Sequence, residues 1–259
     1  MFKILKNLFK PKKIILETID LNIFKNDFGY LNYRQYKITG INQSSNRKKS
    51  INVNAKTEER AISIAKENDL TEPFNVEIIP FKVPSERQLD YAKDLNVFIP
   101  DKACLEDVKC IISRMVEDDK YSPNVGLAQY ADMKGLYFST FIGKKHLYNY
   151  VFDSLEIKDK IAFFIFSVYR WSCDDRHANL NTSPYIKLFY EFAESNLSNE
   201  SFIKSMNKYT GEDIRYFGEL NTPDGYTHSG GSTKTIAFKL CIEFLKNNFK
   251  PKNVNYKYL

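Results

Sequence analysis

Apolar and polar residues alternate along two short segments in the first quarter of the chain, and this period of two predicts β-strands. The first segment runs from Tyr33 to Gly40. The second runs from Lys48 to Ala55 and has Ile51 and Val53 on one face. The polar run at 42–46 between them, Asn-Gln-Ser-Ser-Asn, has the composition of a turn, so the two segments predict a β-hairpin.

The spacing of apolar residues becomes helical after the hairpin. Thr57 can cap a helix from Glu58 to about Asn68, because its hydroxyl can accept a hydrogen bond from a free helix amide. The apolar positions with helical spacing are Ala61, Ile62, Ala65 and, just past the helix, Leu70. A third strand is predicted from Phe74 to Pro80. The pattern predicts a ββαβ unit whose helix covers one face of the sheet.

A pair of helices joined by an extended link is predicted next. Ser85 and Gln88 have the spacing of a capping box at the start of the first helix. The residues at 97–99 precede Pro100 and should be extended, because proline disfavours helix in the residue before it. The second helix runs from about Leu105 to Glu117.

This helix-link-helix segment resembles the SAP-like modules of phage and mobile-element proteins from low-GC Gram-positive bacteria. The resemblance covers residues 84–118 and depends on Gln88-x2-Tyr91-Ala92-x2-Leu95-x3-Ile99-Pro100 followed by Leu105-Glu106-Asp107-Val108. It implies contact with nucleic acid, because SAP-like modules commonly bind DNA. The segment is acidic overall, which argues against strong backbone binding by this module alone.

The remainder of the chain, from Tyr121, is aromatic and helical. The predicted helices are Lys144 to Leu155, Lys158 to Cys173, Pro184 to Asn196, Asn199 to Lys208, Glu212 to Phe217 and Thr233 to Asn248. The fold class expected is α+β in four parts: a basic leader at 1–30, the ββαβ unit at 31–82, the SAP-like module at 83–120 and an α-helical domain at 121–259. The predicted loops are 174–183 and 222–231.

Charge is unevenly distributed along the chain. Residues 1–60 carry 13 basic and 5 acidic side chains, a net charge of +8, whereas residues 61–120 carry 8 and 13. A segregated field of this kind favours an anionic partner at the N-terminal end. We therefore expect nucleic-acid contacts from the exposed cations of the hairpin and of the first SAP-like helix. These candidates are Arg34, Lys37, Arg47, Lys48, Lys49, Arg87 and Lys93.

Aromatic residues accompany the cations of the hairpin. Tyr30, Tyr33 and Tyr36 lie in the same unit, and aromatic faces among cations suit bases and phosphates together. A reading helix with an evident set of Arg, Asn or Gln is absent from the sequence, so we expect weak sequence preference, with backbone contact and stacking dominant.

A glycine-containing segment precedes the last predicted helix. Gly231, Ser232, Thr233 and Lys234 offer hydroxyls, a cation and the free amides of a helix N-terminus, which together suit an anion. The alternative is that Ser232 or Thr233 only caps the helix. The segment does not match a nucleotide-binding P-loop.

One cluster of side chains contains residue types that are common in enzyme active sites. Asp174, Asp175 and His177 can in principle hold a divalent cation, and Cys173 lies four residues from His177. A second set of carboxylates is missing and no orienting residue can be named for a nucleophile. The sequence therefore predicts no catalytic residue, no metal site and no cofactor.

The four cysteines are far apart, with no CxxC pair, which is typical of a reducing compartment, so we expect a cytoplasmic protein. No apolar run is long enough for a membrane span. The leading hypothesis is a non-enzymatic accessory protein of a phage or mobile element that binds DNA or RNA. The alternative is a protein-binding module that inhibits or docks on a host nuclease or defence complex, and a metal-dependent phosphodiesterase ranks third.

Overall fold

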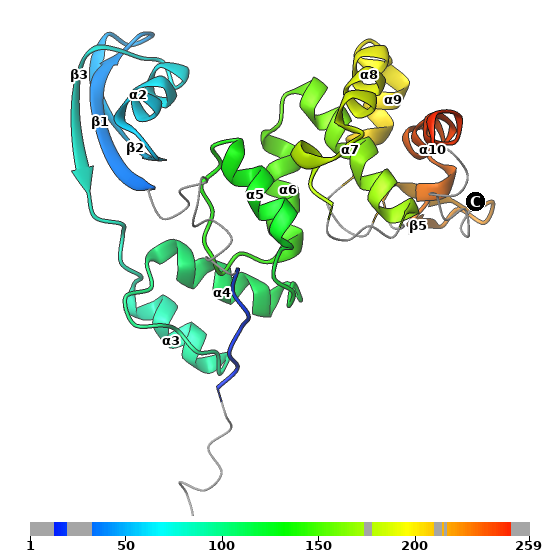
Figure 1. Ribbon diagram of the computed structural model, residues 1–259. Helices are drawn as coiled ribbons and strands as arrows, with labels where there is room; N and C mark the ends of the chain where they lie inside the picture. The colour runs from blue at the N-terminus through cyan, green and yellow to red at the C-terminus, as the bar shows by residue number, and fades with distance from the viewer. Residues whose placement is uncertain (1–12, 20–32, 174–177, 210–213, 215–216, 250–259) are drawn as a thin grey trace, which may run out of the picture. The chain divides into compact units, whose positions relative to one another are not determined.

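The computed structural model describes residues 13–19, 33–173, 178–209, 214 and 217–249. The protein is mixed α+β, with a small antiparallel sheet and many helices (Figure 1), as the sequence predicted. The chain divides into two compact units. The first is Met1–Ser122 with Ala131–Gly143, and the second is Pro123–Tyr130 with Lys144–Leu259. The division of the sequence into four parts remains a prediction.

A three-stranded antiparallel sheet opens the first unit. It consists of β1 (Arg34–Asn42), β2 (Arg47–Ala55) and β3 (Leu70–Ile79) in the order β2-β1-β3. The turn between β1 and β2 forms because the Asn42 side-chain oxygen accepts from the Ser45 amide at 3.0 Å, while Asn46 takes a left-handed conformation with φ of 50°. The predicted hairpin is therefore confirmed.

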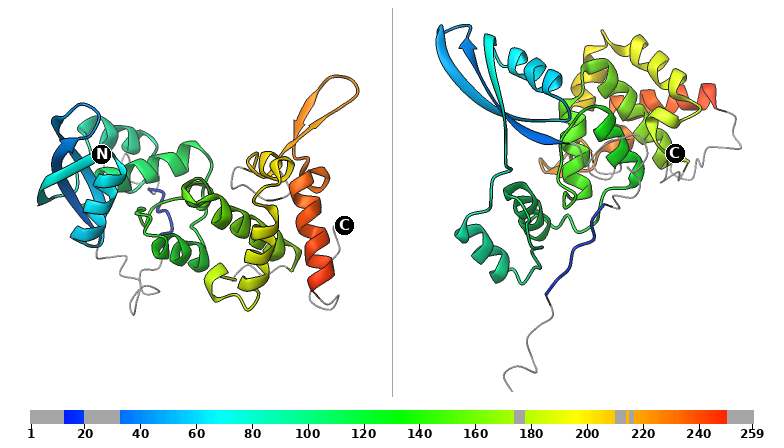
Figure 2. Two further views of the ribbon diagram at one scale, coloured as in Figure 1. Left: turned by 90° about the horizontal axis from the view of Figure 1, so that it is seen from above. Right: turned by 60° about the vertical axis from the view of Figure 1, so that its left-hand side comes forward.

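Helix α2 (Glu58–Glu67) covers one face of this sheet (Figures 1 and 2). Thr57 caps it as predicted, since its hydroxyl oxygen accepts from the Arg60 amide at 3.2 Å. The small side chains of Ala61 and Ala65 let the helix approach the sheet closely. They pack in one core cluster whose other buried members are Tyr36, Ile38, Ala55 and Leu70.

Two further helices, α3 (Glu86–Asp94) and α4 (Leu105–Val116), follow an extended connection after β3. Both halves of the capping box predicted at Ser85 and Gln88 are present. The link passes through Val97, which forms an isolated parallel bridge with Ile14. Helix, extended link and helix are thus observed in the predicted order, and the two helices pack around a small core of Ala92, Val97 and Ile111.

A buried arginine fastens the end of α4. The Arg114 side chain is fully buried, and its guanidinium donates to the carbonyl oxygens of Glu17 at 2.7 Å and of Lys120 at 2.5 Å. It donates to the Asp119 carbonyl as well, at 3.2 Å. These bonds hold the short N-terminal segment against the end of the helix, and burial lowers the pKa of the guanidinium.

The second unit is built around α7 (Ile157–Ser172), whose central residues are all buried. This helix packs against the helices around it, which explains why its sequence is apolar on every side. The neighbours are α6 (Lys144–Ser154), α8 (Ile186–Asn196), α9 (Glu200–Met206) and α10 (Ile236–Asn248). The ring of Phe164 lies edge-on to those of Phe202, Tyr209 and Phe217, which places an aromatic cluster at the centre of the unit.

Several boundaries and elements differ from the sequence predictions. Helix α8 begins two residues after Pro184, and α10 begins at Ile236 rather than Thr233. Helix α5 (Val125–Met133) and the 3-10 turns η3 (Leu180–Thr182) and η5 (Ser232–Lys234) were not predicted. The predicted helix at 212–217 lies mostly outside the described residues.

The segment expected to be a loop after residue 221 is instead part of a small hairpin. Its strands are β4 (Glu219–Asn221) and β5 (Thr227–Ser229), and it projects near α10 (Figure 2, left). Gly225 has a φ of 85° in the turn, a left-handed conformation that glycine adopts without steric cost. Within the part of the chain that the structure describes, no helix is both long and apolar enough to cross a bilayer.

Candidate nucleic-acid interface

The β1–β2 hairpin carries positive charge without any compensating acid. Residues 34–55 contain five basic and no acidic side chains. All five are exposed: Arg34, Lys37, Arg47, Lys48 and Lys49. Within residues 34–79 all six acidic residues lie after the hairpin, from Glu58 onward, so the positive charge of this segment belongs to β1 and β2.

The register of the strands decides which of these cations lie together. Lys37 pairs with Asn52 and Lys48 pairs with Ile41, so both point to the face opposite α2, about 13 Å apart. Arg47 and Lys49 point to the other side, at the end of the sheet near the turn. Together with Lys48 they form a cationic tip, defined here as Arg47, Lys48 and Lys49.

Arg34 does not join the tip. It pairs with Ala55 at the far end of the hairpin, whereas Arg47 pairs with Asn42. Eight residues of extended strand separate the two positions, which amounts to about 26 Å. Of the candidates in the hairpin, Lys37 lies between the two ends, about 10 Å along β1 from Arg34 and about 13 Å from the position opposite Lys48.

The face of the sheet opposite α2, called here the open face, is almost entirely polar. Its members alternate with the core residues along each strand: Gln35, Lys37, Thr39 and Ile41 from β1, Lys48, Ser50, Asn52 and Asn54 from β2, and Asn75, Glu77 and Ile79 from β3. Every one of these side chains is exposed or half-buried. This surface was not predicted, although the alternation Ser50-Ile51-Asn52-Val53-Asn54 indicates it.

Hydrogen bonds across the strands keep part of the open face in place. The Gln35 amide donates to the Asn54 side-chain oxygen at 3.2 Å, and the Thr39 and Ser50 hydroxyls are 2.7 Å apart. Asn75 donates to the Glu77 carboxylate at 2.9 Å. These bonds hold the polar groups of neighbouring strands at fixed spacing, so they can present donors and acceptors to a partner without reorganising.

The tyrosines expected to stack on bases do not lie at the surface. Tyr36 is 3% exposed and packs under α2, and Tyr33 is 7% exposed, with its ring 5.4 Å from that of Tyr137. The prediction that these two residues offer aromatic faces to bases is wrong, because their rings are needed for the core. Tyr30 lies outside the described residues.

A buried ion pair anchors the end of β2. The Lys56 ammonium lies 2.7 Å from the Asp132 carboxylate, whose side chain is fully buried, and 5.3 Å from the centre of the Tyr33 ring. Among the described residues, the second carboxylate oxygen of Asp132 has no hydrogen-bond partner. Burial raises the pKa of this carboxyl, and Lys56 opposes the rise.

The raised pKa of Asp132 predicts a specific dependence of stability on pH. The folded protein binds the proton more tightly than the unfolded chain, whose Asp pKa is about 3.9. Asp132 therefore contributes most to the unfolding free energy below the unfolded-state pKa. This contribution is lost as the pH rises through the higher pKa of the folded protein. We therefore expect the difference in unfolding free energy between the native protein and Asp132→Asn to shift in favour of the native protein as pH falls from 7 to 4. Urea unfolding at several pH values measures it, and a constant difference would contradict the assignment.

The two candidate cations predicted for the helix-link-helix segment lie on α3. Arg87 and Lys93 are both exposed. They are six residues apart and so point about 120° away from each other around the helix. The same helix carries Glu86, Asp90 and Asp94, so its surface is of mixed charge. The geometry does not assemble Arg87 and Lys93 into one patch.

The predicted anion site at Gly231, Ser232, Thr233 and Lys234 differs from expectation. These residues precede α10 rather than start it, and Ser232 is buried within η5. Thr235 caps α10, so the prediction of Ser232 or Thr233 as cap is wrong. The Ala237 amide donates to the Ser205 hydroxyl and the Phe238 amide donates to that of Thr235. Two of the helix amides on which the anion site was argued are therefore already bonded.

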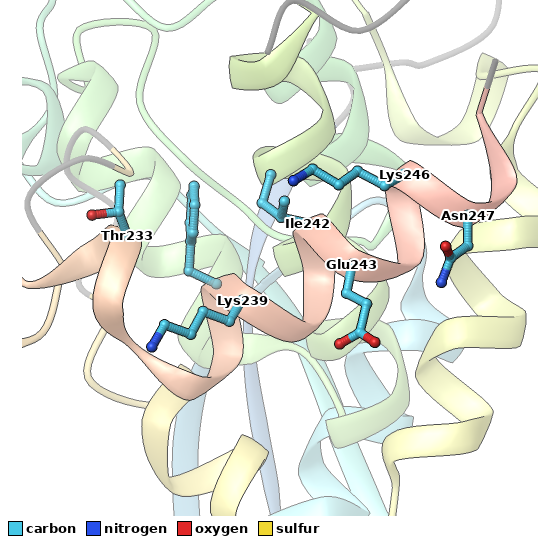
Figure 3. Close-up of a pocket in the computed structure, with 7 residues that line it drawn as sticks. Thr233, Lys239, Ile242, Glu243, Lys246 and Asn247 are labelled. Atoms are coloured by element: carbon cyan, nitrogen blue, oxygen red, sulfur yellow. The ribbon is translucent and has the colours of Figure 1, made fainter. Parts of the chain in front are cut away.

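A shallow cavity of about 300 Å³ lies along α10 (Figure 3). Thr233 is the one residue that it shares with the predicted anion site. The cavity is otherwise lined by α10 itself, through Phe238, Lys239, Ile242, Glu243, Lys246 and Asn247. Its two lysines are accompanied by a carboxylate and two apolar side chains, so it is not a concentrated anion site.

The described residues offer little for catalysis. They contain no group of three or more His, Cys, Asp or Glu side chains placed to hold a metal ion. Asp174, Asp175 and His177 lie outside the described residues, and Cys173 is the half-buried residue that ends α7. Burial raises the pKa of Cys110 to about 12 and that of Cys241 well above its ordinary value, so both thiols stay protonated at neutral pH.

No family model, no curated protein and no solved structure matches the chain. Interpretation of the interface therefore depends on its own charge, register and side-chain chemistry.

Proposed function

We propose that this protein binds nucleic acid, with the β1–β2 hairpin as the main contact. The observation that carries the proposal is the set of five exposed cations in residues 34–55, where no acid offsets them. Such a surface neutralises phosphates and gains from the release of their counterions. Lys37 and the cationic tip make the primary contact in this proposal, while Arg34 lies about 26 Å along the hairpin from the tip.

The helix-link-helix formed by α3 and α4 supports a second, weaker contact. Its resemblance to SAP-like modules of phage and mobile-element proteins is the reason to assign it to nucleic acid and to propose such an element as the source. Arg87 and Lys93 are its exposed candidates. Because residues 83–120 carry six basic and nine acidic side chains, this module contributes less than the hairpin.

We propose an accessory role rather than an enzymatic one. The sequence contains no complete catalytic or metal-binding motif. The thiols of half-buried Cys110 and buried Cys241 are poor nucleophiles, because burial raises the pKa of each.

A protein-binding module that docks on a host nuclease or defence complex is the second candidate. The observation that favours it is the number of exposed apolar side chains between residues 78 and 98, in β3, in α3 and in the segments on either side of α3. They are Ile78, Val83, Leu89, Tyr91 and Phe98. In this proposal some of them form an apolar contact with a protein partner. Unlike the hairpin, this surface would bind its partner with little dependence on salt.

Titration of a fluorescently labelled duplex with the full chain at low salt tests the proposal. We expect an increase in anisotropy that saturates, for DNA and for RNA probes, and that polyanion competitors reverse. If neither probe binds at low salt, the nucleic-acid proposal is wrong and the protein-binding candidate takes precedence.

A further inference from the structure

The open face has the chemistry of a surface that contacts bases rather than phosphates alone. We infer that it enters the major groove of duplex DNA and reads base edges there, an inference that rests on the proposed function. Its carboxamides and its central lysine are the reading groups, and the cationic tip holds the flanking phosphates.

The width of the β1–β2 ribbon fits the groove. Neighbouring strands lie about 4.8 Å apart, and the major groove of B-form DNA is about 12 Å wide, enough to admit a two-stranded ribbon. β1 and β2 are paired over nine positions from Arg34↔Ala55 to Asn42↔Arg47 without interruption. The reading residues lie on this paired ribbon and on the neighbouring β3.

The exposed groups at the middle of the open face match the hydrogen-bonding pattern of base edges. Asn52 is exposed and lies opposite Lys37, which in turn lies opposite Glu77 on β3. An Asn side chain can bond to both groups of an adenine edge, and a lysine can bond to the acceptors of guanine. The carboxylate of Glu77 can accept from a cytosine amino group. Asn75 adds a second exposed carboxamide on the same face.

The same face is unsuited to the competing partners. Its apolar members, Ile41 and Ile79, are half-buried, so it lacks the aromatic and aliphatic anchors typical of protein interfaces. Unpaired strands are bound by stacking on aromatic rings, but Tyr36 is buried on the opposite side. The deep, narrow major groove of an RNA helix does not admit side chains for reading.

Two exposed cations of the hairpin, Lys37 and Lys48, lie on the open face itself. Arg47 and Lys49 point to the other side of the sheet at the tip, so in this docking they contact phosphates beside the groove and not within it.

This arrangement changes one expectation from the sequence. Weak sequence preference was expected because no helix carries a reading set of side chains. A sheet can read bases without such a helix, since strands also enter grooves. We expect each base pair contacted by two hydrogen bonds to be preferred by about 5- to 150-fold over its alternatives.

Selection from a pool of duplex DNA with a randomised centre tests the inference. The full chain is expected to enrich a short motif. Asn52→Ala/Asn75→Ala should lose that motif while binding the unselected pool within about threefold of the native affinity, because no charge is removed. The matched control, Asn207→Ala/Asn247→Ala, removes two exposed carboxamides of the second unit and should keep the motif.

The possible results distinguish a failure of this inference from a failure of the proposed function. If the native protein binds the pool but enriches nothing, or if the double variant keeps the motif, base reading by this face is wrong and the proposed function stands. If RNA or single-stranded DNA is bound in preference to every DNA duplex, the assignment of the open face to the major groove is overturned. If no nucleic acid is bound at all, the proposed function fails and the inference fails with it.

Discussion

Replacing Arg47, Lys48 and Lys49 together with alanine is expected to weaken binding to duplex DNA by about 100-fold at about 0.1 M salt. Each phosphate contact contributes about 0.9 to the slope of log affinity against log salt, so losing three contacts removes roughly two to three orders of magnitude at this concentration. The loss should be similar for every sequence, because phosphates carry no sequence information. The fold should survive, since all three side chains are exposed.

The matched control for this variant is Lys187→Ala/Lys204→Ala/Lys239→Ala. It removes the same charge from exposed positions on α8, α9 and α10. Fluorescence anisotropy at fixed salt compares the two. We expect the control to lose less than about fivefold, because these lysines are not part of the proposed contact and the long-range effect of charge is screened over about 10 Å at this salt concentration. Equal losses in both variants would mean that total charge, and not the hairpin, determines affinity.

Phe164→Ala is expected to destabilise the second unit by about 3–5 kcal/mol. The ring is fully buried at the middle of α7, and the surrounding rings of Phe202, Tyr209 and Phe217 are held by their own helices or segments, so the cavity cannot collapse easily. This cost is a large share of the stability of a typical domain. Phe164→Leu, which keeps most of the volume, should cost much less.

Hydrogen exchange followed by mass spectrometry measures that effect for each segment. Protection of α7, α8 and α10 should fall in Phe164→Ala, whereas the amides of β1 should keep theirs, because the sheet has a core cluster of its own. An equal loss of protection in β1 would show that the two units do not unfold separately.

The sequence predicted those elements whose signals are local. The period of two in Tyr33 to Gly40, the capping hydroxyl of Thr57 and the capping box of Ser85 each act within a few residues, and each is found where expected. The covered face of the sheet followed from the same alternation. Its polar counterpart could have been predicted by the same reasoning from Asn52 and Asn54.

The features that the sequence did not predict depend on partners distant in the chain. β3 begins at Leu70 rather than Phe74, because pairing with β1 extends it. Helix α5 has no clear apolar stripe, so its periodicity gave no signal. Burial of Tyr33 depends on Tyr137, a hundred residues away, and the start of α10 depends on the Ser205 hydroxyl. In each case a tertiary contact outweighed the local pattern.

The salt dependence of DNA binding tests the central claim most directly, because counterion release is the direct consequence of phosphate contacts by the hairpin. Log affinity of the native protein for a duplex should fall linearly with log salt, with a slope of about −3.6 to −4.5, which corresponds to four or five phosphates at about 0.9 each. The Arg47→Ala/Lys48→Ala/Lys49→Ala variant should give a slope shallower by about 2 to 3. A native slope near zero, or a variant slope unchanged from the native one, would contradict binding through this hairpin.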